Sequence, residues 1–587
     1  MKKSHNKAMA ASLSHNFLII NALAKIKRRT IHTNYERTIF LRRQTSALAV
    51  PAISVLPSAT RQDEQWLQLH QNLATSSIRL TPPPKSDIGG FRMKGNQSTG
   101  IKSFEVPMMD ITVTRKGKYE LLIEKQDRML VEAPIFASDK IRLERDAIQQ
   151  LKDAASLPSV FRAFGMPDIH VGYGVPIGSV VATRDIIMPA AVGYDINCGM
   201  RVLTTPMNAD PKEAVRIAES IRRDIPLGEG KKNISLPEDD FRMVMERGVK
   251  GLRKVSRKQG RVWDVRDENE ENDDIQKIEE FGSMDGDSSA VSQRALERGR
   301  TQLATLGGGN HFIEIQEVQK VFDTDLASRF GLWQGQMVVM IHTGSRGFGH
   351  QVAGDYMRKA REVSLDRAPN KDLCFLDVGT DLAADYIGAM HCAANFAFLN
   401  RQIMTILVRH DIRMLYGDRN MPLPIIYDVA HNIAKLEEHF GEKVWVHRKG
   451  ATRAFPKSRM SGTVYADVGQ PVLIPGSMGT ASYVLLGTEE SARTLNSVNH
   501  GAGRTMSRTK AAGVVSRKGK IKRAGAISDE DFRKSMEGIH LICENRFAIK
   551  EEAPQAYKDI DEVVHVVAEA GLAKVLARMV PLAVLKG

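Results

Sequence analysis

The feature that most constrains this chain is a set of five potential metal ligands in four distant segments. Asp195 and Cys198 lie three residues apart between glycines in AVGYDINCGM, residues 191–200. Three histidines follow, each beside glycine, asparagine or alanine: His311 in GGGNHFIE, His342 in IHTGSRGFGH and His431 in YDVAHN. Side chains so far apart form one site only if the tertiary fold brings their loop or strand ends together.

One carboxylate, one thiolate and three imidazoles could hold two divalent ions if Cys198 bridges them. A pair of ions of this kind clamps the attacking and leaving oxygens of a phosphoryl displacement. The alternative is that each histidine satisfies a hydrogen bond in the core, as most buried histidines do. The similar small-residue context of all three histidines favours the metal site.

Length and composition limit the class of protein. A chain of 587 residues has room for two to four domains, or for one large core with insertions. Its 42% hydrophobic and 26% charged residues are typical of a soluble globular protein. No uncharged apolar run is long enough to span a bilayer, so we expect no membrane partner. The four cysteines form no CxxC pair, which excludes a disulfide scaffold and a zinc finger.

The first 60 residues differ in charge from the rest of the chain. They contain ten Lys or Arg and one acid, so +9 of the net +14 lies there and charge is weak evidence for nucleic-acid binding. A basic, hydroxyl-rich segment with few acids resembles an organellar transit peptide, with the mitochondrion expected first and the plastid as alternative. A secretory signal is the rival interpretation, but basic residues directly after the apolar run 17–24 argue against it. Without import, the protein would be cytoplasmic.

The remaining chain divides into a linker and a catalytic domain. Residues 61–103 are rich in Pro, Ser and Gly and predict a flexible linker, and the folded domain is expected from 104 to 587. Within it, residues 227–304 are charged and irregular and predict an expanded insertion, in which DENEENDD (267–274) is expected to be a solvated surface segment without the spacing of a calcium loop.

Periodicity predicts several elements around the candidate site. We expect a strand from Phe104, helices over 140–155, 213–223 and 382–410, and a buried strand over 336–341 that leads into a loop with His342 and Arg346. WVHRKGATRAF (445–455) predicts a basic hairpin-like turn. Two apolar strands are expected around 475–478, whose turn could present N–H groups to phosphate. His170, among glycines, predicts either a turn histidine or a residue that supports a metal ligand.

Several motifs together resemble one known family. DINCG, GGGNHFIE, HTGSRGFGHQVA, AHN, WVHRKGATRA, PGSMGTASY, HGAGR and the C-terminal LKG are similar, in order, to signatures of the RtcB family of RNA ligases. The resemblance runs from about Phe104 to Gly587. It implies an α+β fold in which mixed sheets with surrounding helices enclose a deep central metal and nucleotide cleft. It also implies a ligase that joins RNA 3′-phosphate or 2′,3′-cyclic phosphate ends to 5′-hydroxyl ends, using GTP and Mn²⁺, in tRNA splicing or RNA repair.

The resemblance assigns roles to individual residues. Two Mn²⁺ ions would be held by Asp195, Cys198 and His311 and by Cys198, His342 and His431, and His500 would carry GMP through a phosphoramidate bond. GTP contacts would come from Asn310, His311, Phe312, Glu314, His431, Asn432, Pro475, Gly476, Ser477, Met478, Ser482, His500, Gly501, Ala502, Gly503 and Lys586. RNA phosphates would be bound by Arg346, Arg504 and Arg508.

The resemblance also names partners and leaves alternatives. Expected partners are broken or intron-containing tRNA, GTP and an archease-type activator. A thiolate with several imidazoles would by ligand softness suggest zinc before manganese, so manganese rests on the resemblance. A metal-dependent phosphoesterase would use the same metal ligands without His500, and a non-ligating RNA-end binding protein would need only the arginines.

Overall fold

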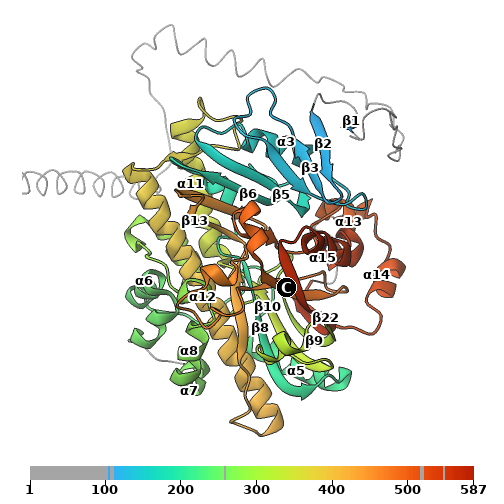
Figure 1. Cartoon of the computed structure of the whole chain (residues 1–587). Coiled ribbons are helices and arrows are strands. Elements are labelled where there is room, and N and C mark those ends of the chain that lie inside the picture. The colour runs from blue at the N-terminus through green and yellow to red at the C-terminus, as the bar shows by residue number, and fades with distance from the viewer. Residues whose placement is uncertain (1–102, 106–110, 257–259, 516–520, 546–548) are drawn as a thin grey trace, which may run out of the picture. The chain divides into compact units, whose positions relative to one another are not determined.

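The computed structural model describes residues 103–105, 111–256, 260–515, 521–545 and 549–587. The predicted leader (1–60) and nearly all of the predicted linker (61–103) lie outside these residues. Among the described residues, no helix is long and apolar enough to cross a membrane. The architecture is a mixture of several sheets and helices (Figure 1), as the sequence predicted.

The first large sheet has eight strands in the order β1-β2-β3-β4-β5-β6-β14-β13. Their bounds are β1 (Ser103–Glu105), β2 (Thr112–Gly117), β3 (Glu120–Ile123), β4 (Ala133–Phe136), β5 (Val160–His170), β6 (Ile177–Thr183), β14 (Glu442–Lys449) and β13 (Asn432–His439). Neighbouring strands are antiparallel except β4 and β5, which are parallel. Helices α3 (Arg145–Ala154) and α15 (Ile560–Glu569) contribute to the same hydrophobic core as this sheet.

The second large sheet contains most of the candidate metal ligands or their neighbours. Its order is β12-β8-β10-β9-β22-β17-β16, with β21 parallel to β22. The bounds are β12 (Ile425–Ala430), β8 (Gly199–Asn208), β10 (Gln336–Thr343), β9 (Phe312–Val321), β22 (Ala573–Lys586), β17 (Ser482–Gly487), β16 (Pro471–Ile474) and β21 (His540–Cys543). Apart from β21, its neighbouring strands are antiparallel.

Smaller elements complete the part of the chain that the structure describes. Three two-stranded pairs are β7 (Ile186–Ile187) with β11 (Leu376–Asp377), β15 (Ala451–Arg453) with β18 (Ser497–Asn499), and β19 (Gly513–Val515) with β20 (Ile521–Ala524). The other α-helices are α4 (Pro189–Val192), α5 (Pro211–Asp224), α6 (Glu238–Arg247), α7 (Arg261–Val265), α8 (Glu268–Ile275), α9 (Gln293–Gly299), α10 (Thr324–Ser328), α11 (Arg346–Ser364), α12 (Asp381–Tyr416), α13 (Arg508–Ala512) and α14 (Asp529–Ser535). The 3-10 helices are η1 (Gly248–Lys254), η2 (Glu279–Gly282), η3 (Ser288–Ala290), η4 (Lys457–Arg459), η5 (Glu489–Thr494), η6 (Ile549–Glu552) and η7 (Pro554–Ala556).

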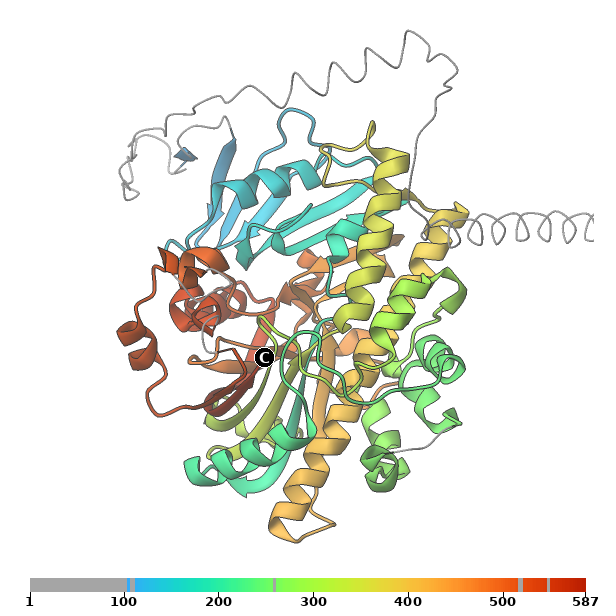
Figure 2. The same ribbon diagram turned by 180° about the vertical axis from the view of Figure 1, so that it is seen from behind.

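Helix α12 is the long central helix of the domain. It has 36 residues, about 54 Å of rise, and is buried on nearly all sides through its middle. A helix that is apolar all round belongs inside a protein rather than at its surface. The Thr380 side chain caps its N-terminus, and Gly417, at φ 68°, ends it in the left-handed conformation that glycine adopts without strain. Both views show it running alongside the second sheet (Figures 1 and 2).

A buried ion cluster joins α12 to the second sheet. Asp428 of β12 accepts from Arg401 of α12 through both oxygens at 2.8 Å, and from Arg201 of β8 at 2.8 Å. All three side chains are fully buried. Arg401 also donates from Nη1 to the carbonyls of Asn197 and Thr343, both at 2.9 Å. Because those carbonyls neighbour Cys198 and His342, the cluster holds the backbone next to two candidate ligands.

The basic segment 445–455 is not the predicted hairpin-like turn. It forms the end of β14 and the short β15, with Gly450 between them at φ 60°. Two of its cations are buried: Arg448 donates to the Glu437 carboxylate at 2.5 and 2.9 Å, and the ammonium group of Lys449 donates to backbone carbonyls. The hairpin prediction was wrong because β14 and β15 pair with other strands and not with each other.

The acidic stretch 267–274 is also less exposed than predicted. It forms the N-cap and nearly all of α8, and Glu271 and Asp274 are each only 2% exposed. Asp274 accepts from both terminal nitrogens of Arg409, at 2.7 and 2.8 Å. A run of charges can therefore pack inward when it meets arginines from another helix. The expansion of 227–304 relative to the family stays a prediction, although this region contains α6 to α9 rather than irregular structure alone.

Other predicted elements occur with shifted boundaries. The helix expected over 140–155 begins only at Arg145, and α12 extends past the expected 382–410. The helix expected over 213–223 is α5. His342 lies within β10, and Arg346 is the first residue of α11, so neither is on the loop where the sequence placed them.

Candidate active site

Four of the five candidate ligands lie at one end of four adjacent strands. His431 follows the last residue of β12, and Cys198 precedes the first residue of β8. His342 is near the end of β10, and His311 precedes the first residue of β9. Because neighbouring strands in the order β12-β8-β10-β9 are antiparallel, these starts and ends share one edge of the sheet. Strand spacing of about 4.8 Å then brings the side chains within reach of one another.

A tight turn adds the fifth candidate ligand. In DINCG the Cys198 N–H donates to the Asp195 carbonyl at 3.1 Å, which closes a four-residue turn. Asn197 occupies its third position at φ 57°, a left-handed conformation that asparagine tolerates. The Asn197 amide donates to the Ala394 carbonyl of α12 at 2.9 Å. The turn thus brings Asp195 back towards the thiol of Cys198.

The ligand atoms approach closely in two groups. The Cys198 Sγ lies 3.3 Å from His311 Nε2 and 3.2 Å from His342 Nε2. His311 Nε2 is 2.7 Å from the Asp195 carboxylate, and His342 Nε2 is 3.4 Å from His431 Nε2. Asp195, Cys198 and His311 form one group and Cys198, His342 and His431 the other, each with its ligand atoms within 4.8 Å of one another. Cys198 belongs to both groups.

The ionisation of these groups fits a cation site. Burial and the nearby Asp195 carboxylate raise the pKa of Cys198 well above its usual value. Burial lowers the pKa of His342 and of His431, so both imidazoles are neutral and have a lone pair. The buried Nδ1 atoms of His311 and His342 have no hydrogen-bond partner among the described residues. A divalent cation would replace the thiol proton and use the converging lone pairs.

His500 lies beside this cluster and is held by a buried aspartate. Its ring centroid is 4.9 Å from that of His431. Its Nδ1 is 2.6 Å from Asp168 Oδ2, and the same oxygen accepts from the backbone N–H groups of His500 at 3.1 Å and Gly501 at 3.3 Å. Asp168 is fully buried in β5. An Nδ1–H donor to Asp168 leaves the lone pair on Nε2, the tautomer that a nucleophilic histidine needs.

Asp168 was not among the residues predicted for the site. His170, two residues later, was predicted instead, and its Nδ1 contacts only the Asp168 carbonyl, at 2.8 Å. An acid inside the otherwise apolar strand FGMPDIH was the available signal, because a buried carboxylate needs a specific partner. Gly503 packs against the same strand: a Cβ there would lie 2.1 Å from the Asp168 carbonyl oxygen, so only glycine permits this approach.

A cavity of about 690 Å³ opens beside His500 and the cluster. It is lined by these residues expected at metal, GTP or RNA: Asp195, Asn310, Phe312, His342, His431, Asn432, Pro475, Gly476, Ser477, Met478, His500, Gly501, Ala502, Gly503, Arg504, Arg508 and Lys586. Its size suits a nucleotide. Of the other expected contacts, Glu314 and Ser482 are buried next to Gln316 and do not line the cavity, and Cys198 is 2% exposed.

Two buried ionisable groups near this cavity lack full partners. Burial raises the pKa of Glu314 to about 8, and its Oε1 has no hydrogen-bond partner among the described residues. Lys586 is 3% exposed, and burial lowers the pKa of its ammonium group. Its Nζ donates to the His311 carbonyl at 3.3 Å. A buried acceptor at Glu314 and a buried donor at Lys586 fit a ligand that offers both hydrogen-bond donors and an acceptor.

The three arginines expected at RNA phosphates are engaged with the protein. Arg504 and Arg508 donate to the buried Glu552 carboxylate at 3.2 and 3.0 Å. Arg346 is 9% exposed and donates to the Gly228 carbonyl at 3.2 Å. The Arg508 side chain is still 52% exposed, so it can reach a ligand while it is held at Nε. Their role as phosphate contacts stays a prediction.

A second, larger cavity shares lining residues with the one beside His500. Its volume is about 1190 Å³, and Tyr194, Asp195, His311 and Arg346 are among its lining residues. Tyr194, Asp195, Asn310 and Arg508 line both cavities. The candidate metal ligand Asp195 therefore borders both.

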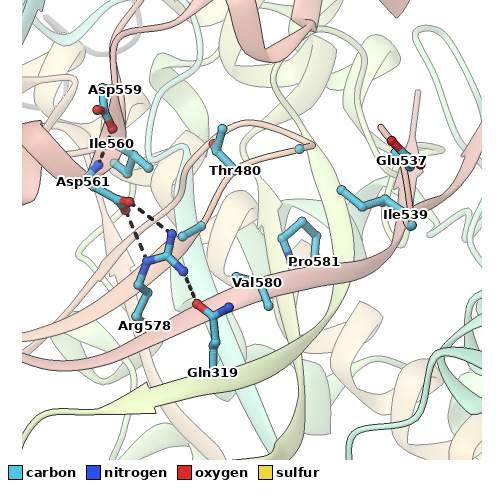
Figure 3. A pocket seen from close by; sticks show the side chains of 13 residues that line it. Gln319, Thr480, Glu537, Ile539, Asp559, Ile560, Asp561, Arg578, Val580 and Pro581 are labelled. Carbon is cyan, nitrogen blue, oxygen red and sulfur yellow. Dashed lines mark hydrogen bonds and ion pairs between the residues drawn. The ribbon is translucent and has the colours of Figure 1, made fainter. Parts of the chain in front are cut away.

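A third cavity, of about 420 Å³, is separate from these residues. Figure 3 shows Arg578 in its wall, held by Asp561 and by Gln319, while Val580 and Pro581 line another part. None of the residues expected at metal, GTP or RNA is among its lining residues. Since Asp561 already neutralises the guanidinium group of Arg578, we assign it no part in the candidate site.

The fold and site define a class of protein. A mixed-sheet domain holds two ligand groups that share a cysteine, next to a histidine whose Nδ1 is bound by a buried aspartate. This is a candidate two-metal site with an adjacent candidate nucleophile, an arrangement suited to phosphoryl or nucleotidyl transfer.

Comparison with known proteins specifies the family. The family model described as "tRNA-splicing ligase RtcB" matches residues 150–587. The tRNA-splicing ligase RtcB of Thermococcus kodakarensis is 41% identical over 501 residues, which cover 81% of this chain and 99% of the relative. That of Pyrobaculum aerophilum is 42% identical over 508 residues, covering 82% and 100%. RNA-splicing ligase RtcB homolog 1 of Entamoeba dispar is 37% identical over 524 residues, covering 84% and 94%. The chain belongs to the RtcB family, as its motifs indicated.

Proposed function

We propose that this protein is an RNA ligase that consumes GTP to join RNA 3′-phosphate or 2′,3′-cyclic phosphate ends to 5′-hydroxyl ends, in tRNA splicing or RNA repair. The observation that supports this most is His500, whose Nδ1 is 2.6 Å from the buried Asp168 and whose ring is next to His431. A phosphoesterase would need the metal ligands but has no use for a nucleophilic histidine. Family membership supports the same conclusion.

Two divalent ions would be held by the two ligand groups that share Cys198. When bound, they would neutralise phosphate charge and lower the pKa of the attacking 5′-hydroxyl group. We propose Mn²⁺ from the family resemblance, although a thiolate with imidazoles would also suit zinc. Asp195 contributes a harder oxygen ligand to one group, which is compatible with manganese.

His500 is the proposed carrier of GMP. Its Nε2 lone pair attacks the α-phosphorus of GTP, a P–N bond forms, and the bond to the β-phosphate oxygen breaks, so that pyrophosphate leaves. Asp168 accepts a hydrogen bond from Nδ1–H, so the proton stays on the His500 ring. Its negative charge also stabilises the positive charge that develops on that ring, as the aspartate of a catalytic triad does. The two backbone N–H groups that also bind Asp168 keep this carboxylate in place.

The RNA then receives GMP and is joined. A 2′,3′-cyclic phosphate end is first opened by water to the 3′-phosphate. An oxygen of the RNA 3′-phosphate attacks the phosphorus on His500, and the P–N bond breaks. The 5′-hydroxyl oxygen next attacks the RNA phosphorus, its proton is released to solvent, and GMP leaves. Activation with GMP is needed because a phosphate monoester has no good leaving group. Arg346, Arg504 and Arg508 are the proposed cationic contacts for RNA phosphates.

The base of GTP would contact Lys586, which lines the cleft beside His500, and would reach Glu314 if that buried side chain turns toward the cleft. Guanine has N–H groups that can donate to the free Oε1 of Glu314, and an O6 acceptor that Lys586 can bind. Both side chains are buried and have unused hydrogen-bonding capacity. Adenine has an amino group in place of O6, so Lys586 would face a donor, which favours GTP over ATP.

The test is covalent labelling. The purified protein is incubated with Mn²⁺ and GTP labelled at the α-phosphate, and acid-labile label on the protein is measured. We expect labelling of the wild type, none for His500→Ala, and normal labelling for His565→Ala, which removes an exposed histidine of α15. A protein that releases phosphate from RNA ends but acquires no label would be a phosphoesterase, and the ligase proposal would fail.

A further inference from the structure

Two aromatic rings stack beside the candidate metal cluster. Tyr194 directly precedes Asp195, and His350 lies on α11, one helical turn after Arg346. Their ring centroids are 4.6 Å apart and their planes differ by 21°, which is a stacked arrangement. Tyr173 contacts Tyr194 in a tilted orientation, with centroids 6.1 Å apart. The three rings thus come from separate segments of the chain and meet at the site.

This pair of rings is exposed rather than part of the core. Tyr194 is 40% exposed, and His350 is also exposed. Neither ring belongs to the hydrophobic clusters found among the described residues. An exposed aromatic pair contributes little to folding, since much of its surface outside the mutual contact remains in water. An interaction with a ligand is the better explanation for its position.

The pair lies between the two cavities of the site. Both rings line the cavity of about 1190 Å³, and Tyr194 also lines the one beside His500. The larger cavity is also lined by Lys232, Arg298 and Arg300, together with the acids Glu229 and Glu297. Aromatic faces next to cationic side chains are the combination by which proteins bind single-stranded nucleic acid.

We propose that Tyr194 and His350 form a stacking platform for a nucleobase of an RNA end at the ligation site. The base would add a further layer to the Tyr194–His350 stack, while its phosphate lies towards the metal cluster that begins at Asp195. This inference rests on the proposed RNA-ligase function and adds a base-binding subsite to it. Stacking accepts any base, so the subsite gives affinity without sequence preference.

The test is a double-mutant cycle between the platform and the base. Joining is measured with RNA whose terminal nucleotide is normal or abasic, separately at the 3′-phosphate end and at the 5′-hydroxyl end, for the wild type and Tyr194→Ala. With normal RNA, we expect Tyr194→Ala to raise the KM for one end on the order of tenfold. With the abasic form of that end, the KM of the wild type should rise by the same factor, and the KM of Tyr194→Ala should rise no further. The end that shows this coupling identifies the stacked nucleotide.

Control variants separate stacking from damage to the site. Labelling of His500 by GTP needs no RNA, so Tyr194→Ala should keep it if the Asp195 turn and metal ligands are intact. Tyr194→Phe retains the ring and should recover most of the RNA affinity, and His350→Ala should weaken binding of the same end from a different element. Phe322→Ala is the matched control, because Phe322 is 47% exposed and follows β9 at the end opposite His311.

The platform proposal fails if Tyr194→Ala and removal of the base affect joining independently. If the abasic substitution costs as much in Tyr194→Ala as in the wild type at both ends, no base stacks there. If wild-type protein neither acquires label from GTP nor joins RNA, the proposed function fails instead. A wild type that ligates normally while the cycle shows no coupling refutes the platform alone.

Discussion

Replacing Asp168 with asparagine tests the proposed nucleophile most directly. The Asp168 carboxylate accepts from His500 Nδ1 and from the backbone N–H groups of His500 and Gly501, all through Oδ2. Asparagine has nearly the same shape, so packing in the fully buried site should survive. With its amide oxygen at the Oδ2 position, asparagine can accept the same three hydrogen bonds, but it lacks the negative charge that stabilises the positive charge developing on His500.

The expected loss follows from the lost negative charge. A hydrogen bond to a charged group contributes about 1.5–3 kcal/mol, equivalent to a factor of roughly 10 to 150 in rate. We therefore expect Asp168→Asn to slow labelling of His500 by a factor on the order of 10 to 10².

The assay is single-turnover labelling with GTP carrying a labelled α-phosphate. Asp467→Asn, at a carboxylate that is 84% exposed, is the matched control and should label at the wild-type rate. Asp168→Asn should still join RNA that already ends in an activated 3′-GMP diphosphate, since His500 has no further transfer to make. If a folded Asp168→Asn protein is labelled as fast as the wild type, the Asp168 carboxylate does not assist the attack by His500.

The remaining predictions concern the metal ligand, the carrier, the leader and the buried ion cluster. Cys198→Ala should abolish both GTP labelling and ligation, because one thiolate belongs to both ligand groups; full activity would refute a shared ligand. His500→Ala should abolish labelling and joining of 3′-phosphate RNA but spare joining of pre-activated RNA; equal failure on both substrates would point to a structural role. Deleting residues 1–60 should leave ligation in vitro unchanged and prevent organellar import, which localisation of a fluorescent fusion measures. Asp428→Ala should lower the free energy of unfolding by about 3–5 kcal/mol, measured by denaturant titration, because it leaves Arg201 and Arg401 buried without their counter-charge; a change below 1 kcal/mol is not expected.

The identity of the candidate ligands could be predicted from sequence because their chemistry is local. The sequence alone shows a cysteine three residues after an aspartate, between glycines. It also shows the histidines in segments of small residues. The apolar strand leading to His342 was also visible, since a short buried strand has a characteristic composition. Asp168 was not recognised, because a single acid in a strand gains meaning only from the histidine that it meets 332 residues later.

Charge was the least reliable guide to location. Asp274 was expected at the surface and Arg448 and Lys449 in a basic turn, yet all three are buried with partners from other elements. Whether a charged side chain can be buried depends on its partner, and that partner is distant in sequence. Local composition therefore predicts exposure poorly where long-range ion pairs form.

The sequence by itself determined the kinds of side chain available for chemistry, the family to which the chain belongs, and the buried strand that leads into His342. Only the tertiary structure decided which of these side chains meet. Antiparallel order in one sheet brings His431, Cys198, His342 and His311 to a single edge, and the first sheet brings Asp168 to His500. The reason is physical: propensity and periodicity act over a few residues, whereas strand order depends on packing of the whole core.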